Sequence, residues 1–324
     1  MTVRERIVPF AAGDVKFKPG SRYQGPVLDV KADTIGVWWW ETSLIFKPNK
    51  AVGADVDDML DMLIQNKVNE IYLYINNISE WTDDKTPREQ GDIDERLLAG
   101  FIEKCAKYGI RVSALTGDGG RFACCWFDPE RGYPETAEFL QMISGYNARV
   151  AKNQRFYGIH VDLEPHIEDD RPYYLGQFAR YIATLREWCD EKMLEFAMDI
   201  NAWYNEKDMV TLDGRKINIM QVLASCCHEL LIMAYRTDAE SQMEISKYEY
   251  GWVKAFGCKV LIACETMLPK DLGDEGFISY YNIGSKKMAE EQKKLCALLK
   301  DSGYQNTGIA IHWTNSWYYM NRHV

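Results

Sequence analysis

Eight short runs rich in apolar, β-branched and aromatic residues alternate with amphipathic stretches along the chain, and this alternation restricts the fold more than any other feature. The expected strands are Ile35–Trp40, Glu70–Asn76, Arg111–Thr116, Tyr157–Glu164, Glu195–Ala202, Leu230–Tyr235, Lys259–Glu265 and Thr307–Thr314. Apolar residues at spacings of three and four predict helices over Val56–Lys67, Ile93–Tyr108, Pro134–Ala151, Tyr173–Met193, Lys216–Ser225, Tyr248–Gly257 and Lys287–Ser302. A βα unit that recurs in this way over about 290 residues predicts an α/β fold, the (β/α)8 barrel.

The runner-up fold is a doubly wound parallel sheet, but the glycine-rich fingerprint of its dinucleotide site is missing from the sequence. Residues 1–33 precede the first strand and are expected to form an N-terminal extension, which leaves residues 34–324 as the barrel domain. The stretches after the strands are long, and in a barrel the loops after the strands build the active site. We therefore expect a walled cleft at that end, formed by Asn77–Asp92, Gly117–Tyr133, Pro165–Arg171, Trp203–Arg215 and Thr266–Tyr281.

Charge and hydropathy argue against two classes of partner. The chain has 38 Lys and Arg against 48 Asp and Glu, and it lacks a basic cluster that would neutralise nucleic-acid phosphates. No apolar run approaches the roughly 18 residues that a membrane-spanning helix needs. The nine cysteines, an odd number, favour free thiols in a reducing compartment, so we expect a cytoplasmic protein; a secreted protein whose signal peptide has been removed also fits. The oligomeric state stays open.

The fourth expected strand carries the densest set of chemically active side chains. Its residues alternate, so that His160, Asp162 and Glu164 share the face that would point into the barrel. Asp162 and Glu164 would lie about 6.5–7 Å apart along this row, with Glu164 at the catalytic end. Two carboxylates so placed repel each other, which raises one pKa and keeps a proton available near neutrality. Protonation of a glycosidic oxygen requires such a pair, and Glu164 is the expected general acid.

This strand resembles the corresponding strand of glycoside hydrolase family 18, the chitinase-like barrels, which carry Asp-Gly-x-Asp-x-Asp-x-Glu there. Gly158, Asp162 and Glu164 match the pattern, whereas Tyr157 replaces the first Asp and His160 replaces the middle one. The resemblance implies a chitinase-like barrel that cleaves a glycosidic bond in a carbohydrate substrate. It also implies that Glu164 is the acid and that the substrate's own N-acetyl group is the nucleophile, oriented by Asp162 and by the tyrosine of strand six.

Three further motifs of this family are partly matched. The strand-six motif Met-x-Tyr-Asp corresponds to Met233-Ala234-Tyr235, with Arg236 where the family has Asp. The tryptophan that ends strand eight beneath the sugar corresponds to Trp313. The strand-three motif Ser-x-Gly-Gly is echoed by Gly119-Gly120, with Gly117 where Ser belongs. The resemblance implies that the tyrosine of strand six acts with the strand-four carboxylates as a catalytic residue.

A second resemblance is to retaining barrel glycosidases, which carry Asn-Glu-Pro on strand four and a second Glu at the end of strand seven. Glu164-Pro165 and Glu265 correspond to these residues, with Leu163 in place of Asn. Retaining catalysis places the two carboxyl groups about 5–5.5 Å apart, and Glu265 would then form a covalent glycosyl intermediate. A third alternative is a carbohydrate-binding barrel without turnover, which the departures from the family 18 motifs favour.

Inward-facing polar and aromatic residues at the strand ends are candidates for binding the sugar. The fifth strand alternates so that Asp199, Asn201 and Trp203 face inward, where polar groups suit hydroxyl recognition. His160 is expected to order Asp162, and the lack of a His-x-His or Cys/His set predicts no metal; we also expect no cofactor. The expected catalytic residues are Glu164, Asp162, Tyr235 and Glu265, and the expected substrate-binding residues are Trp38, Trp40, His160, Asp199, Asn201, Trp203, Arg236 and Trp313.

Overall fold

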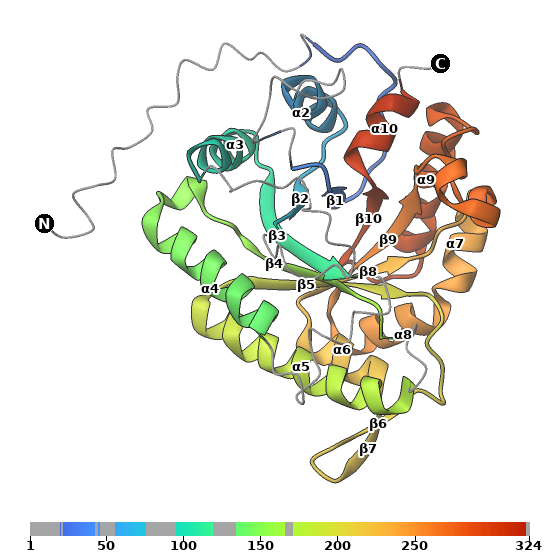
Figure 1. The fold of residues 1–324 in the computed structure, drawn as a ribbon. Coiled ribbons are helices and arrows are strands. Elements are labelled where there is room, and N and C mark those ends of the chain that lie inside the picture. Colours follow the sequence, from blue (N-terminus) through green and yellow to red (C-terminus); the bar gives the residue numbers. More distant parts are fainter. Residues whose placement is uncertain are drawn as a thin grey trace, which may run out of the picture.

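Eight parallel strands close into a barrel in the order β1-β10-β9-β8-β5-β4-β3-β2 (Figure 1). The structure is a computed structural model that describes residues 20, 22–42, 45, 56–75, 95–118, 134–165 and 171–321. The barrel strands are β1 (Thr34–Trp39), β2 (Glu70–Tyr74), β3 (Arg111–Asp118), β4 (Gly158–Leu163), β5 (Glu195–Asn201), β8 (Glu229–Met233), β9 (Lys259–Glu265) and β10 (Thr307–His312). Every expected strand is present with boundaries shifted by at most two residues, and the expected (β/α)8 barrel is confirmed.

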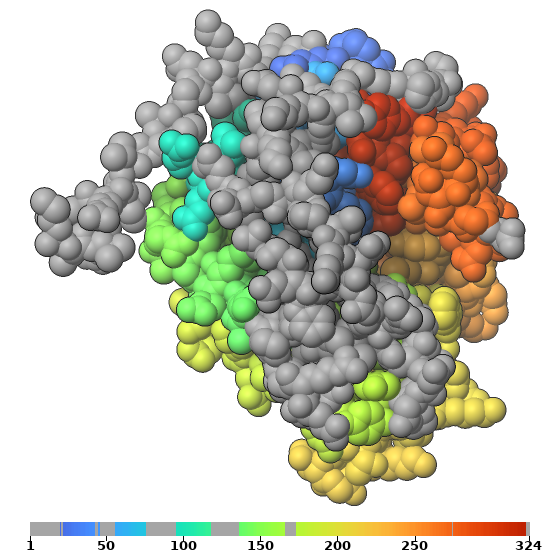
Figure 2. All heavy atoms as spheres, in the orientation of Figure 1, coloured from blue at the N-terminus to red at the C-terminus, as the bar shows by residue number. Residues whose placement is uncertain are grey.

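Helices surround the barrel and cover the outer face of its strands (Figure 1). They are α2 (Val56–Gln65), α3 (Glu95–Lys107), α4 (Pro134–Arg149), α5 (Arg171–Lys192), α6 (Ile219–Cys226), α7 (Ala239–Ile245), α8 (Lys247–Phe256), α9 (Ser285–Asp301) and α10 (Thr314–Met320), with short 3-10 turns η3 (Lys152–Gln154), η5 (Pro269–Asp271) and η6 (Gly273–Ile278). The space-filling view shows α4 in green on one flank and α9 and α10 in orange and red on the other (Figure 2). Within the described ranges, no helix is both long and apolar enough to cross a membrane.

The expected helix over Lys216–Ser225 is wrong in its first turn, and the expected loop before it contains a strand. Strand β6 (Met209–Leu212) pairs antiparallel with β7 (Arg215–Asn218), and α6 begins only at Ile219. Asp213 and Gly214 form the two-residue turn with φ values of 50° and 74°. Such an Asp-Gly turn matches the twist of a hairpin, and it sets the pairing of Leu212 with Arg215. The hairpin projects from the barrel below α6 in Figure 1.

The strands separate two apolar clusters, one between the sheet and the helices and one inside the barrel. In the tryptophan triplet of β1, Trp39 packs outward against Phe101 of α3, with ring centroids 5.1 Å apart, whereas Trp38 belongs to the inner cluster. The inner cluster consists of Trp38, Tyr72, Tyr74, Leu115, Ala197, Leu231, Leu261, Ala263 and Ala310, with Trp40, Tyr235 and Trp313 packed against it. The alternation of strand residues therefore sets which side chains reach the interior of the barrel.

The described residues before β1 pack on α2. The backbone N–H groups of Arg22 and Tyr23 donate to buried Asp61 at 2.9 and 2.8 Å, and the N–H of Leu28 donates to Asn66 at 2.5 Å. The division of the chain at residue 33 stays a prediction. Of the long stretches after the strands, 77–92 and nearly all of 117–133 and 165–171 lie outside the described residues.

Candidate functional site

Residues at the carboxyl ends of the strands form one cluster of polar and aromatic side chains. Glu164 and Tyr235 follow β4 and β8 closely, and Asn201, Glu265 and His312 are the last residues of β5, β9 and β10. Because all the strands of this barrel are parallel, their carboxyl ends lie on one face. Residues that are far apart in the sequence therefore lie together in this cluster.

Strand β4 presents His160 and Asp162 on the inward row that the alternation predicts, and Glu164 directly follows the strand. The ring of His160 is fully buried 4.2 Å from that of Tyr72 in the inner cluster, whereas the side chains of Asp162 and Glu164 are half-buried nearer the open end. Gly117 of β3 pairs with Asp162, and a Cβ atom at residue 117 would lie 2.2 Å from the Asp162 carbonyl oxygen. A glycine is therefore required for β3 to approach the backbone that carries Asp162.

Glu164 has the environment of an acid that holds its proton. The Asn201 side-chain amide donates a 2.9 Å hydrogen bond to Glu164 Oε2, which fixes the carboxyl group over the end of β5. Burial raises the pKa of Glu164 above its usual value, although this hydrogen bond and the charge of His312 act in the opposite direction. The protonated form of Glu164 therefore persists to a higher pH than that of an exposed glutamate.

Asp199 forms a buried pair with His160 beneath the open end of the cluster. Oδ2 of Asp199 lies 2.8 Å from His160 Nε2 and accepts a 2.9 Å hydrogen bond from the indole N–H of Trp38. Burial raises the pKa of Asp199 well above its usual value, and burial lowers the pKa of His160 to about 3. Both shifts favour uncharged forms. The contact of His160 with Asp199 was not expected from the sequence; the expected ordering of Asp162 by His160 stays a prediction.

The phenol of Tyr235 lies among the carboxylates of the cluster. Burial raises the pKa of Tyr235 well above its usual value, and the charges of Glu265 and Asp162 raise it further. Tyr235 therefore keeps its proton and acts as a hydrogen-bond donor toward whatever group meets it. Its ring stacks on the imidazole of His312, with centroids 5.8 Å apart and an interplanar angle of 30°.

Glu265 and His312 form a second buried pair on neighbouring strands. The two residues are in register between β9 and β10, and Glu265 Oε2 lies 2.9 Å from His312 Nδ1. Oε1 of Glu265 accepts hydrogen bonds from the backbone N–H groups of Thr266 and Met267, both at 2.7 Å. The indole N–H of Trp40 donates to His312 Nε2 at 2.9 Å. Both carboxylate oxygens of Glu265 are therefore already engaged, and its side chain is only 2% exposed.

The other expected binding residues differ in their placement. Trp313 packs against the inner cluster, and its ring lies 5.1 Å from that of His312. Arg236 donates to the carbonyl of Tyr235 at 2.7 Å and is half-buried. Trp203 lies in the turn after β5 and is 59% exposed. These roles in binding stay predictions.

Two residues of this cluster were not among the expected site residues. His312 occupies an inward row of β10 that the sequence alternation reveals, but nothing in the sequence pairs it with Glu265 or Trp40. Glu41, which follows β1, accepts a 3.1 Å hydrogen bond from the Asn315 side chain, and burial raises its pKa. Only the closure of the barrel brings residues 41 and 315 together.

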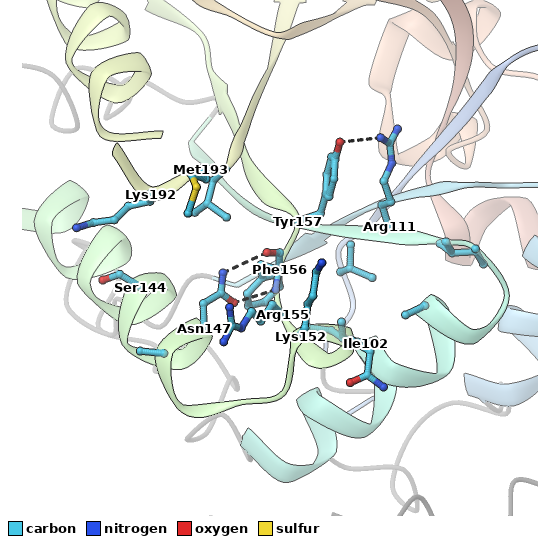
Figure 3. A pocket seen from close by; sticks show the side chains of 17 residues that line it. Ile102, Arg111, Ser144, Asn147, Lys152, Arg155, Phe156, Tyr157, Lys192 and Met193 are labelled. Carbon is cyan, nitrogen blue, oxygen red and sulfur yellow. Dashed lines mark hydrogen bonds between the residues drawn. The ribbon is translucent and has the colours of Figure 1, made fainter. Parts of the chain in front are cut away.

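A hollow of about 790 Å³ lies at the opposite end of the barrel, where β3, β4 and β5 begin (Figure 3). Two of its polar side chains already have structural partners. The Asn147 side chain accepts from the Phe156 N–H at 2.9 Å and donates to the Phe156 carbonyl at 3.1 Å, and Arg111 donates to the Tyr157 hydroxyl at 2.9 Å. None of the clustered acids lines this hollow, so we assign the candidate site to the other end. Within the described ranges, no group of three or more His, Cys, Asp or Glu residues is arranged to hold a metal ion.

Comparison with known proteins relates this barrel to chitinases through structure alone. The sequence matches no protein-family model and no curated protein. Solved structures that share the fold include a chitinase from Chromobacterium violaceum (12% identity, 90% of this chain and 98% of that chain, TM-score 0.52) and one from Bacteroides thetaiotaomicron (12%, 90% and 96%, 0.53). A family 18 chitinase from Cycas revoluta, solved in complex with (GlcNAc)3, is similar to the same degree (11%, 89% and 98%, TM-score 0.51). The resemblance to chitinase-like barrels is thus confirmed for the fold.

Proposed function

We propose that this protein is a glycoside hydrolase in which Glu164 is the general acid and the substrate is an N-acetylated sugar. The observation that carries the proposal is the environment of Glu164. It stands at the open end of the barrel, its carboxyl group is oriented by Asn201, and burial raises its pKa. A carboxylic acid whose raised pKa keeps its proton to a higher pH, and which is held in one orientation, can protonate the oxygen of a glycosidic bond.

Tyr235 and Asp162 provide the groups that a substrate-assisted reaction needs. In that reaction the acetamido oxygen of the sugar attacks the anomeric carbon while Glu164 protonates the leaving oxygen. The phenol of Tyr235 stays protonated, so it can donate to the attacking acetamido oxygen. Asp162 contributes to the negative potential at Tyr235 and can accept from the acetamido N–H, stabilising the positive charge that develops on this group.

The engagement of Glu265 favours this reaction over the two-carboxylate alternative. A carboxylate nucleophile must present an accessible oxygen to the anomeric carbon, and the Glu265 side chain is only 2% exposed. Both oxygens of Glu265 instead accept hydrogen bonds within the protein, from two backbone N–H groups and from His312. We therefore propose that Glu265 does not form a glycosyl intermediate.

The proposal predicts that the acetamido group of the substrate is essential. Aryl glycosides of N-acetylglucosamine and its oligomers should be hydrolysed, whereas matched glycosides with a 2-hydroxyl should react at least about 10²-fold more slowly, because they lack the internal nucleophile. Release of the aryl alcohol measures both rates. Equal rates for the two series would contradict substrate assistance. Stabilisation of the protein by the sugars without any release across both series would favour the binding barrel.

A second prediction separates the two mechanisms at Glu265. Glu265→Ala should retain measurable hydrolysis, and added azide should not be incorporated into the product, because the carboxylate removed is not a nucleophile that azide could replace in attack on the anomeric carbon. The products can be identified by mass spectrometry. Loss of activity that azide restores, with formation of a glycosyl azide, would identify Glu265 as the nucleophile instead.

A further inference from the structure

His312 lies at the centre of the candidate site, although its role is not explained by the proposed reaction. Its imidazole contacts three aromatic rings from two other strands and hydrogen-bonds a buried carboxylate on a third. The ring centroids of Trp38, Trp40 and Tyr235 lie 5.4, 6.1 and 5.8 Å from that of His312. The side chain is 14% exposed, so it forms the lower wall of the site rather than its open surface.

The hydrogen bonds of His312 determine its tautomer. An indole N–H can only donate, so the Trp40 contact at 2.9 Å requires a free lone pair on His312 Nε2. Burial lowers the pKa of His312, but the charge of Glu265 and its hydrogen bond more than offset this effect, so the pKa is raised overall. Once the ring is neutral, its single proton is on Nδ1, which lies 2.9 Å from Glu265 Oε2. Glu265 is in turn held through Oε1 by the backbone N–H groups that follow β9. Donation runs from Trp40 to His312 and from His312 to Glu265, and the backbone N–H groups donate to Glu265 from its other side, so the carboxylate accepts at both ends of this hydrogen-bond chain.

We propose that His312 is a positioning residue that transmits the fixed orientation of Glu265 to Trp40 and Tyr235. The proposal rests on the proposed function for its consequence in catalysis. Trp40 is held by its hydrogen bond to Nε2, and Tyr235 is held by stacking on the imidazole plane. Glu265 acts on the reaction through His312, which accounts for a buried carboxylate with no free oxygen at the mouth of the barrel.

This hydrogen-bond chain predicts an unfavourable contact between two donors when Glu265 is replaced by Gln. In Glu265→Gln, the side-chain NH2 must face either the two backbone N–H groups or the Nδ1–H of His312, and each choice opposes donor to donor. The imidazole can escape by moving its proton to Nε2, but that proton then opposes the indole N–H of Trp40. Replacing Trp40 by Phe removes this second conflict and keeps an aromatic ring.

The test is a double-mutant cycle on the hydrolysis of an N-acetylglucosamine aryl glycoside. Glu265→Gln alone should lower kcat by about 10²-fold, as expected when a positioning group moves the reacting groups by about 1 Å. In the Trp40→Phe background, the same replacement should lower kcat by a markedly smaller factor, because His312 can then adopt the other tautomer. Glu195→Gln, a replacement of a half-exposed glutamate at the opposite end of β5, is the matched control and should change kcat little. If Glu265→Gln lowers kcat by the same factor in the natural protein and in Trp40→Phe, the proposal is overturned.

The tautomer can be measured without any substrate, which separates this inference from the proposed function. Long-range proton–nitrogen NMR on protein with 15N-labelled histidine distinguishes the two tautomers, and the signals of His312 are those lost in His312→Gln. We expect the Nδ1–H tautomer above the pH at which the imidazolium loses its proton. The Nε2–H tautomer would overturn the inference even in an active enzyme. If His312 has the Nδ1–H tautomer but the protein hydrolyses no glycoside, the result would support the hydrogen-bond chain and contradict the proposed function.

Discussion

Glu164→Gln should lower kcat on an N-acetylglucosamine aryl glycoside by about 10²- to 10⁴-fold, the usual contribution of a positioned general acid. The amide has the shape of the acid and can still accept the 2.9 Å hydrogen bond from Asn201, so the barrel should fold normally. It has no proton to give to the leaving oxygen. Circular dichroism and the release of the aryl alcohol measure the fold and the rate. A variant that is folded and fully active would exclude Glu164 as the acid.

The same variant tests the direction of the pKa shift. Glu164 acts in its protonated form, and burial raises its pKa, so kcat/KM of the natural protein should be high at acidic pH and fall as pH rises through that pKa. The fall should lie at a higher pH than for an exposed glutamate, and it should disappear from the residual activity of Glu164→Gln. Leaving groups that need no protonation provide a control, because their release should suffer least in the variant. An unchanged alkaline limb in Glu164→Gln would assign that limb to another group.

Lys259→Met should reduce the free energy of unfolding by about 3–5 kcal/mol, the usual effect of removing one partner from a buried ion pair. Lys259 Nζ lies 2.5 Å from both Glu70 and Glu229 at the amino-terminal end of the barrel. Both carboxylates are nearly buried, and the Tyr72 hydroxyl lies within hydrogen-bonding distance of both from inside the barrel. Arg111 still pairs with Glu70 in the variant, so Glu229 is the carboxylate left without a cation.

Chemical denaturation measures this loss, and two variants make it specific. Lys247→Met removes a lysine whose partner Glu244 is as exposed as itself, at 75% each, and should change stability by less than about 1 kcal/mol. In a Glu229→Gln background, Lys259→Met should be less destabilising than in the natural protein, because the amide needs no cation. Equal destabilisation in the two backgrounds would show that the lysine stabilises the barrel through packing of its aliphatic chain.

The alternation of residues along the strands made the barrel predictable. Apolar positions of period two define a strand with one face toward the helices, and the long amphipathic stretches between such strands supply the helical crossovers that parallel pairing requires. The same alternation predicted that Asp162 and Glu164 share an inward row; in the structure Asp162 lies in β4 and Glu164 directly follows it, and their catalytic roles stay predictions. The β6–β7 hairpin was missed because apolar spacing alone was read through residues 216–218, whereas the Asp213-Gly214 turn is the stronger local signal.

The side-chain contacts between strands depend on how the sheet closes into a barrel. Which residues meet across the barrel depends on the order of the strands and on their relative shift, and neither is encoded in the pattern of a single strand. His160 meets Asp199 because β4 lies beside β5, and Glu265 meets His312 because β9 and β10 pair in the register that makes them neighbours. Trp40 reaches His312 only because β1 closes the barrel against β10. The sequence by itself therefore determined the elements and the inward-facing residues, since both follow from local periodicity. The tertiary structure decided the partners, since burial and barrel closure bring together groups from distant strands.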